Sequence, residues 1–331
     1  MIYIIFFMIY IIYYKKKGII MNIYFGIRST GNNLHLGHIL SLLNMFDFIE
    51  KNKIKHIYIL LAELHSEISN IPEKEIINNS KLLANKILAL YNTYLIFNNL
   101  NNNNISKIKF IFQNNDEISN YHISITYKYL PLLNISRLMK NPIFKNNKNN
   151  SVAFLLYPIL QAFDVLLYHN EKNFTTVFLG NDQKSNINIM KDIYKKLNIK
   201  NINFNIFENV IYDITCKEKM SKSLNNFINF NDFKGIEEYI IKYKTGNNNY
   251  CYLYNNILKY FIKYFNMKHE CTDNNCFNCK QNILKQLKLV INNYNNYSFN
   301  NYNTISKYDL INNYNLILNK IDNIRCNNED C

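Results

Sequence analysis

The hydrophobic positions along the chain alternate between short apolar runs and longer amphipathic segments. Four short apolar runs are typical of buried strands, at residues 22–27, 56–62, 109–113 and 176–179. Four longer segments repeat apolar residues at helical spacing, at residues 35–50, 76–94, 154–168 and 187–197. Strands that alternate with helices predict βαβ units, and therefore an α/β protein with a parallel sheet.

The pattern changes after residue 231. From there to residue 331, helical segments are separated by Asn-rich joints and no clear strand is visible. Residues 141–150 form a separate polar, Lys/Asn-rich loop within the first part of the chain. The sequence therefore predicts a parallel-sheet domain at 21–230 followed by an all-helical domain at 231–331.

Composition narrows the class of protein. The chain has 331 residues, of which 48% are hydrophobic, so wholesale disorder is excluded. Only 7 Gly and 4 Pro exclude collagen-like and Pro-rich linker architectures. The net charge of +14 suits a polyanionic partner, because each neutralised phosphate releases counterions. An AT-rich genome also enriches Lys, so the charge alone does not identify nucleic acid.

The first twenty residues are expected to lie outside the fold. Residues 1–14 are almost entirely apolar and three lysines follow them. This segment is shorter than the ~20 residues of a spanning helix, and it lacks the flanks of a secretory signal. An organelle-targeting leader, a membrane-surface anchor and a start upstream of Met21 are all compatible with it. We favour a leader or an upstream start, and expect no stable membrane partner.

Residues 35–38 read His-Leu-Gly-His and open a predicted helix just after a strand and a Gly-containing turn. His35 and His38 share one helical face, and Gly37 allows a ligand to approach the backbone. The amino end of a helix also suits a phosphate. Alone, the motif is equally compatible with a metal pair or with surface histidines.

Residues 219–223 read Lys-Met-Ser-Lys-Ser and lie in a polar loop late in the chain. The ammonium groups of Lys219 and Lys222, flanked by the hydroxyls of Ser221 and Ser223, can follow the charge of a departing pyrophosphate. Alone, such a loop is usually a solvated turn. Together with the histidine motif, in this order, it is far more specific.

The two motifs resemble the HIGH and KMSKS signatures of the class I aminoacyl-tRNA synthetases. The resemblance extends over roughly residues 22–245. It implies a Rossmann-type catalytic domain at 21–230 and a helical tRNA anticodon-binding domain at 231–331. It further implies that an amino acid is activated with ATP and magnesium and then esterified to tRNA. The chain has no room for an editing domain, which implies the subclass shared by tryptophanyl and tyrosyl enzymes.

The middle of the chain resembles the bacterial-type tryptophanyl enzymes. The similar stretches are residues 137–142, 157–168, 180–184 and 189–193, and Ser221 before Lys222 agrees with them. This resemblance implies a tryptophan–tRNA ligase whose partners are tRNA(Trp), ATP and L-tryptophan. It also implies a homodimer.

Other positions favour the tyrosyl enzymes. Tyr24 stands where those enzymes place a tyrosine that bonds the substrate phenol, and Gln161 is similar to their helix. Ser29, where Pro is usual, departs from both patterns. Tyrosine–tRNA ligase, a non-catalytic synthetase-derived tRNA-binding protein and another nucleotidylyl transferase are therefore the alternatives.

Residue roles follow from the resemblance. The catalytic residues would be His35, His38, Lys219 and Lys222. ATP would be bound by Arg28, Thr30, Gly37, Lys145, Gly180, Asp182, Ser221 and Ser223. The amino acid would be bound by Tyr24, Tyr157, Gln161, Asp164 and Gln183. The residues themselves support Asp164, because a carboxylate on an apolar helix costs several kcal/mol unless it is paired.

A cysteine group lies in the predicted helical domain. Cys271, Cys276 and Cys279 lie close together, Cys251 lies one helix upstream, and His269 is adjacent. Four thiolates could hold zinc or a [4Fe–4S] cluster, and incidental loop cysteines are the alternative. Some bacterial tryptophanyl enzymes carry an iron–sulfur cluster, so the resemblance favours iron over zinc. The remaining cysteines are taken as incidental, at Cys216, Cys326 and Cys331.

The compartment depends on the first residues. A bacterial-type enzyme with a hydrophobic leader would be organellar, in a plastid or a mitochondrion, and we favour that location. If the chain came from an AT-rich bacterium and its start were misassigned, it would be cytoplasmic.

Overall fold

The computed structural model describes most of the chain. The described residues are 20–69, 71–113, 116–140, 152–208, 211–213, 220, 226–243, 251–269, 276–297, 303 and 307–328. Apart from Ile20, the predicted leader lies outside them. No helix within these ranges is both long and apolar enough to cross a bilayer.

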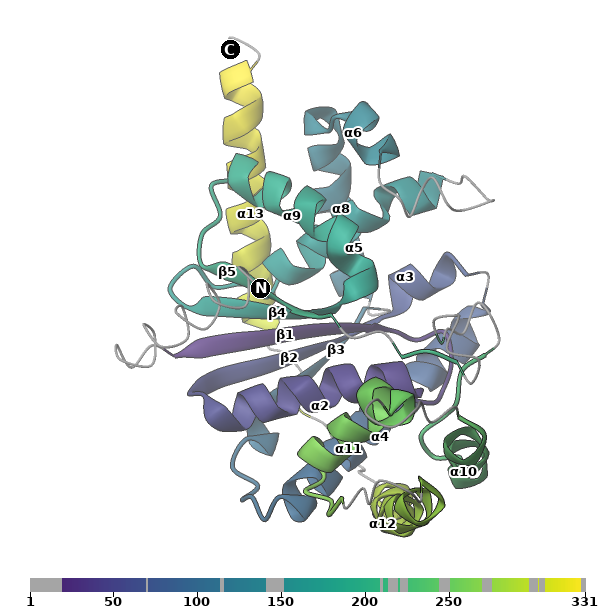
Figure 1. The fold of residues 1–331 in the computed structure, drawn as a ribbon. Coiled ribbons are helices and arrows are strands. Elements are labelled where there is room, and N and C mark those ends of the chain that lie inside the picture. Colours follow the sequence, from purple (N-terminus) through teal and green to yellow (C-terminus); the bar gives the residue numbers. More distant parts are fainter. Residues whose placement is uncertain are drawn as a thin grey trace.

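The centre of the fold is a five-stranded, all-parallel sheet in the order β3-β2-β1-β4-β5 (Figure 1). Its strands are β1 (Met21–Arg28), β2 (Ile54–Ala62), β3 (Ile108–Phe112), β4 (Phe174–Gly180) and β5 (Ile202–Phe207). The predicted α/β class with a parallel sheet is confirmed, and so are four of the strands. The edge strand β5 was not anticipated, because Asn203 and Asn205 interrupt its apolar residues.

Helices cover both faces of the sheet (Figure 1). One face carries α2 (Leu36–Lys51), α4 (Glu73–Phe97), α10 (Phe233–Lys242), α11 (Lys259–Tyr264) and α12 (Cys276–Asn296). The other carries α5 (Asp116–Tyr129), α8 (Val152–Leu166), α9 (Lys184–Lys196) and α13 (Lys307–Asn328). Shorter elements are α3 (Glu63–Glu67), α6 (Ile135–Met139), η1 (Ile105–Lys107), η2 (Leu130–Leu132), η3 (Asn181–Gln183) and the π-helical η5 (Tyr254–Leu258).

Alternation along β1 divides the molecule into two cores. Ile23, Phe25 and Ile27 pack against the α2 and α4 side, whereas Tyr24 points into the core beneath α5, α8 and α9. Successive side chains of a strand point to opposite faces, so a strand buried on both sides is apolar throughout. Tyr24 is thereby placed on the same side of the sheet as α8, which carries Asp164.

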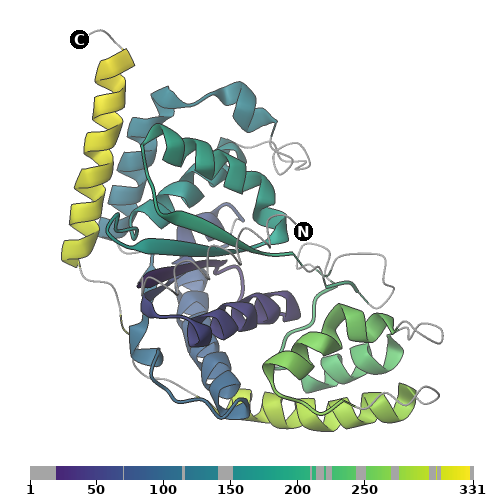
Figure 2. The same ribbon diagram turned by 60° about the vertical axis from the view of Figure 1, so that its left-hand side comes forward.

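The helical part of the chain occupies two places. Helices α10, α11 and α12 pack below α2 and α4, where Phe230 is fully buried against the rings of Phe261, Phe265 and Tyr294. Helix α13 lies on the opposite side of the sheet in both views (Figure 2). There, Ile321 is fully buried against the core that contains α5 and α8. The division at residue 231 does not anticipate this position of α13.

Candidate amino-acid and nucleotide site

The predicted site residues gather at the carboxyl edge of the parallel sheet. Arg28 ends β1 and Gly180 ends β4, and these two strands are neighbours at the centre of the sheet. Sheets of this kind bind ligands in the crevice outside the carboxyl ends of their strands, where the strand order reverses. Thr30 lies in the turn after β1, and Asp182 lies in η3, which follows β4 directly.

A cavity at this edge is lined by most of the residues that we expected to hold the amino acid. Its walls include Tyr24, Gly26, Arg28, His65, Tyr157, Gln161 and Asp164, with apolar side chains from β2, β4, α8 and α9. Gln183 is linked to this group through Asn186, whose Nδ2 donates to Gln161 Oε1 at 2.9 Å and to Gln183 Oε1 at 2.9 Å. The fold therefore brings all five predicted amino-acid residues to one place.

Asp164 is buried at the end of this cavity and is bonded by three side chains. Gln113 Nε2 donates to its Oδ1 at 2.6 Å, and His65 Nε2 lies 2.7 Å from its Oδ2. The Nε2 atom of His122 bonds Oδ1 as well. The sequence predicted a carboxylate reserved for a ligand, whereas the structure gives it three protein partners.

The charges around Asp164 keep it ionised. Burial alone would raise the pKa of its carboxyl, but the imidazoles of His122 and His65 outweigh burial and hold the pKa at about 2. Tyr24 is also buried, and both its burial and the charge of Asp164 raise the pKa of its phenol well above the ordinary value. The cavity therefore presents a neutral phenol and an ionised carboxylate.

The histidine motif forms the start of α2. His35 is the N-cap residue, and its Nδ1 accepts from the backbone N–H groups of Gly37 at 3.1 Å and His38 at 3.4 Å. Its ring stacks on that of His38 with the centroids 3.6 Å apart. We expected these amides to face a phosphate. Since His35 caps them, these two amides already have an acceptor within the protein.

A side chain at residue 37 would crowd the His35 ring. A Cβ atom at residue 37 would lie 3.0 Å from Cε1 and 3.1 Å from Nδ1 of that ring. The glycine therefore permits the cap and the imidazole stack to form together.

The segment that follows the lysine motif is bonded to the histidine motif. Leu36 N donates to Ile228 O at 3.1 Å, and Phe230 N donates to Leu34 O at 2.9 Å. The ring of Phe227 lies 6.2 Å from that of His35. These contacts place the end of the lysine-containing loop beside the start of α2.

Several predicted site residues lie outside the described part of the chain. They are Lys145, Lys219, Ser221, Lys222, Ser223 and Cys271, and the side chain of Asp182 is also outside it. Met220, within the lysine motif, is buried and its N–H donates to Ile211 O at 2.7 Å.

Ser29, which departs from the family pattern, is fully buried in the turn after β1. Its N–H donates to Ser66 Oγ at 2.8 Å, and its hydroxyl accepts from Ser80 Oγ at 2.7 Å. Its carbonyl accepts from Asn79 Nδ2 at 3.2 Å. The serine thus ties β1 to α3 and α4, where a proline would have no N–H to donate.

The cysteine group does not form the expected metal site in the part of the chain that is described. Cys279 Sγ lies 3.3 Å from His269 Nε2, and Cys251 Sγ accepts from Tyr254 N at 3.4 Å. Among the residues with described positions, no three His, Cys, Asp or Glu side chains could together hold an ion. These residues therefore do not support the zinc or iron–sulfur prediction, and Cys271 lies outside them.

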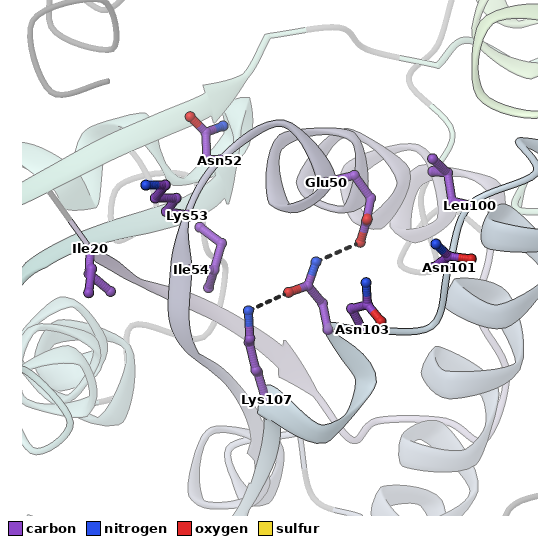
Figure 3. Close-up of a pocket in the computed structure, with 10 residues that line it drawn as sticks. Ile20, Glu50, Asn52, Lys53, Ile54, Leu100, Asn101, Asn103 and Lys107 are labelled. Atoms are coloured by element: carbon purple, nitrogen blue, oxygen red, sulfur yellow. Dashed lines mark hydrogen bonds between the residues drawn. The ribbon is translucent and has the colours of Figure 1, made fainter. Parts of the chain in front are cut away.

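A second cavity, of about 510 Å³, opens at the opposite edge of the sheet (Figure 3). It lies beside the amino ends of β1 and β2, and Ile20 and Ile54 line it. In its wall, Asn104 donates to Glu50 Oε1 at 3.1 Å and accepts from Lys107 Nζ at 2.7 Å. None of the predicted site residues lines this cavity.

Three residues of the site were not predicted: His65, Gln113 and His122. His65 follows β2 and Gln113 follows β3, so the rule that ligands bind at carboxyl ends of parallel strands could have found both. His122 lies inside α5, between Ile118 and Ile125, which pack into the same core, so helical spacing could have placed it on the inward face.

Comparisons with known proteins agree with this geometry. Over 242 residues the chain is 29% identical to the tryptophan–tRNA ligase of Wigglesworthia glossinidia brevipalpis, covering 69% of this chain and 68% of that one. Over 253 residues it is 23% identical to a probable cytoplasmic tyrosine–tRNA ligase of Vairimorpha ceranae, covering 75% and 72%. With several other curated tryptophan–tRNA ligases, the alignment spans about half of their length.

The fold is similar to that of solved synthetases. The tryptophanyl-tRNA synthetase of Mycoplasma pneumoniae superposes with a TM-score of 0.64 at 20% identity, covering 92% of this chain and 94% of that one. The model of the family described as class I tRNA synthetases (W and Y) matches residues 16–303. The chain therefore belongs to the W and Y family of class I tRNA synthetases.

Proposed function

We propose that the protein is a tryptophan–tRNA ligase, which forms tryptophanyl-adenylate from L-tryptophan and ATP and transfers the acyl group to tRNA(Trp). One observation carries the proposal. A cavity containing Tyr24, Gln161 and Asp164 opens at the same sheet edge at which the His35–His38 stack begins α2. Family membership and the predominance of tryptophan–tRNA ligases among the named relatives support this substrate.

The reaction needs positioning rather than a protein nucleophile. The carboxylate of tryptophan attacks the α-phosphate of ATP, and pyrophosphate leaves. Asp164 would accept the indole N–H, because an ionised carboxylate is an acceptor only. The stacked imidazoles of His35 and His38 would lie on the phosphate side. Lys219 and Lys222 would neutralise the leaving pyrophosphate, with the magnesium that accompanies ATP.

Tyrosine is the second candidate substrate, because Tyr24 is buried close enough to Asp164 for the two to interact electrostatically. A phenol hydroxyl both donates and accepts, so it could use this pair fully, whereas an indole N–H needs only the carboxylate. Tyr24→Phe distinguishes the two. A tyrosine enzyme should lose its preference for a phenol, and a tryptophan enzyme should tolerate the change.

The test of the function is amino-acid-dependent ATP–pyrophosphate exchange, with tryptophan and tyrosine compared at matched concentrations. Exchange with tryptophan and not with tyrosine supports the proposal. Exchange with tyrosine alone supports the second candidate substrate. Exchange with neither amino acid refutes the proposal that the protein is such an enzyme. As a matched variant, Lys222→Ala should lower kcat much more than it raises the KM for tryptophan, because its charge acts as pyrophosphate leaves.

We further propose a homodimer, which the family resemblance implies. Exposed apolar side chains repeat at helical spacing on α5, at Ile123 and Tyr127, and on α6, at Ile135 and Met139. Exposed apolar side chains on neighbouring turns of a helix are compatible with an interface with a second copy. Sedimentation of the parent and of an Ile123→Lys variant tests this, and a monomeric parent would refute it.

A further inference from the structure

His122 lies on α5, which packs against both α8 and the carboxy-terminal helix α13. Its side chain is buried and bonded to Asp164. The residue before it, Tyr121, faces α13, where its ring centroid is 4.5 Å from that of Tyr314. The residue after it, Ile123, is exposed. Three successive residues of α5 thus face three different surroundings.

The hydrogen bonds to Asp164 leave one direction open. A carboxylate offers about four lone-pair positions. Gln113 and His122 use Oδ1, and His65 uses Oδ2, so one acceptor position on Oδ2 remains for a ligand. Because Oδ1 is held by two donors, the carboxylate plane cannot turn without breaking both bonds. The direction of the remaining lone pair is therefore set by residues that are not themselves at the ligand.

Helix α13 holds the helix that carries His122. Tyr314 OH lies 3.1 Å from Ser124 Oγ, and the ring of Tyr314 packs against that of Tyr121. Asn313 Nδ2 donates to Leu167 O at 2.8 Å, just after α8, on which Asp164 lies. A single segment of α13 therefore braces both α5 and the end of α8.

We propose that His122 is a positioning residue for the side chain of the amino-acid substrate, and that α13 keeps it in place through Tyr314. This inference rests on the proposed function, since it concerns the same cavity. His122 does not touch the substrate. It orients the Asp164 carboxylate. Substitution of His122 should therefore weaken binding of the amino acid and leave binding of ATP unchanged.

The absence of Trp in the chain makes the test direct. Because the protein contains no tryptophan residue, indole fluorescence excited beyond tyrosine absorption comes from the added tryptophan alone, and its anisotropy reports the fraction that is bound. Tryptophan is titrated with the intact protein, and the KM for ATP is measured by exchange. The variants are His122→Phe, which removes the donor, and His122→Gln, which keeps an N–H of similar reach. Exchange with tyrosine is measured in parallel.

We expect His122→Phe to weaken the binding of tryptophan about ten-fold to a hundred-fold, as loss of a hydrogen bond to a charged group does. The KM for ATP should stay within about two-fold, and His122→Gln should regain most of the affinity. In His122→Phe the acid limb of kcat/KM for tryptophan should also move to higher pH, because Asp164 loses one imidazole. The other titratable groups that interact with Asp164 are His65 and the phenols of Tyr24, Tyr168 and Tyr194.

Two further variants test the role of α13. Tyr314→Ala should weaken the binding of tryptophan about two-fold to ten-fold, the range for loss of an aromatic pair. Leu316→Ala, on the exposed side of the same helix, should leave it unchanged. These variants keep the proposal testable if His122→Phe does not fold.

The outcomes separate this inference from the function. A parent that binds and exchanges neither tryptophan nor tyrosine refutes the proposed function and this inference together. If the folded His122→Phe variant binds tryptophan as tightly as the parent does, only the positioning role is refuted. Equal losses for tryptophan and ATP would reveal a purely structural residue, and would also overturn it.

Discussion

The polar cluster around Asp164 and the cysteine group near α12 differ in one respect. Around Asp164, residues far apart in the sequence are in contact, whereas the cysteines that lie close together in the sequence form no metal group among the described residues. Gln113, His122 and His65 lie 51, 42 and 99 residues from Asp164, and all three bond it. Cys276 and Cys279 lie in one helical turn, yet the sulfur of Cys279 meets His269 and that of Cys251 meets a backbone N–H. Close spacing in the sequence therefore does not by itself make a site.

The difference has a geometric cause. Parallel strands all end at the same edge of a sheet, so residues that follow different strands meet there whatever their separation in the sequence. His65 follows β2 and Gln113 follows β3, so both reach the carboxylate on α8. A short helical segment has no such convergence, because its side chains spread around the helix axis.

Among the variants of the two regions, Asp164→Asn should have the largest effect on stability and activity. The amide keeps one acceptor but presents an N–H₂ group to a cluster of donors, so the buried hydrogen bonds to Oδ1 and Oδ2 cannot all be kept. Breaking a buried pair in this way costs about 3–5 kcal/mol of unfolding free energy. Tryptophan-dependent exchange should fall as well. Denaturant unfolding and exchange kinetics on the same preparation measure the two effects.

Glu238→Gln is the matched control, because this carboxylate pairs with Lys242 on the exposed side of α10. It should leave unfolding free energy and exchange unchanged. An Asp164→Asn protein as stable as this control would mean that the three hydrogen bonds contribute nothing.

The next largest effect should be the loss of unfolding free energy at acid pH, which arises in the Asp164 cluster. The pKa of Asp164 is about 2 in the folded protein, below the ordinary 3.8, so the ionised form stabilises the fold. That contribution is complete above about pH 4 and is lost as pH falls through the folded pKa. Unfolding of the parent between pH 5 and 2 should show this loss, and Asp164→Asn should lack that part of it. Parallel pH curves for the two proteins would contradict the assignment.

Lys280→Met should have a smaller effect, in the cysteine region. Lys280 Nζ donates to Ile241 O at 2.7 Å and to Tyr243 O at 3.0 Å, which ties α12 to the end of α10. Burial lowers the pKa of Lys280, and the neighbouring cysteines act in the opposite direction. Loss of these two bonds should cost about 1–2 kcal/mol. Thermal unfolding measures it, and Lys285→Met on the same helix serves as the control.

Cys276→Ser should have the smallest effect. Since the described residues form no metal group, we expect a change of less than about 0.5 kcal/mol, as for surface substitutions. Iron and zinc analysis of anaerobically purified parent accompanies the unfolding experiment. Stoichiometric metal that disappears in Cys276→Ser would restore the cysteine group as a site and reverse the comparison.

Sequence reasoning was most successful where the chemistry is local. The apolar runs located β1, β2, β3 and β4, and helical spacing located α2, α4, α8 and α9. Tyr157, Gln161 and Asp164 were assigned to the amino-acid site, and the structure places all three at one cavity. It was less successful for β5, in which Asn residues alternate with apolar ones, and for α13, whose partner helix lies far away in the sequence.

The sequence by itself determined the class of fold, the family and the two signature motifs, because each depends on residue type and short-range spacing. Only the tertiary structure decided what surrounds Asp164. Its partners come from α3, from α5 and from the residue after β3, and helical spacing in α5 can indicate that His122 faces inward but not that it meets Asp164. The position of α13 was decided in the same way, because apolar residues such as Ile321 specify that a helix face is buried but not which core buries it.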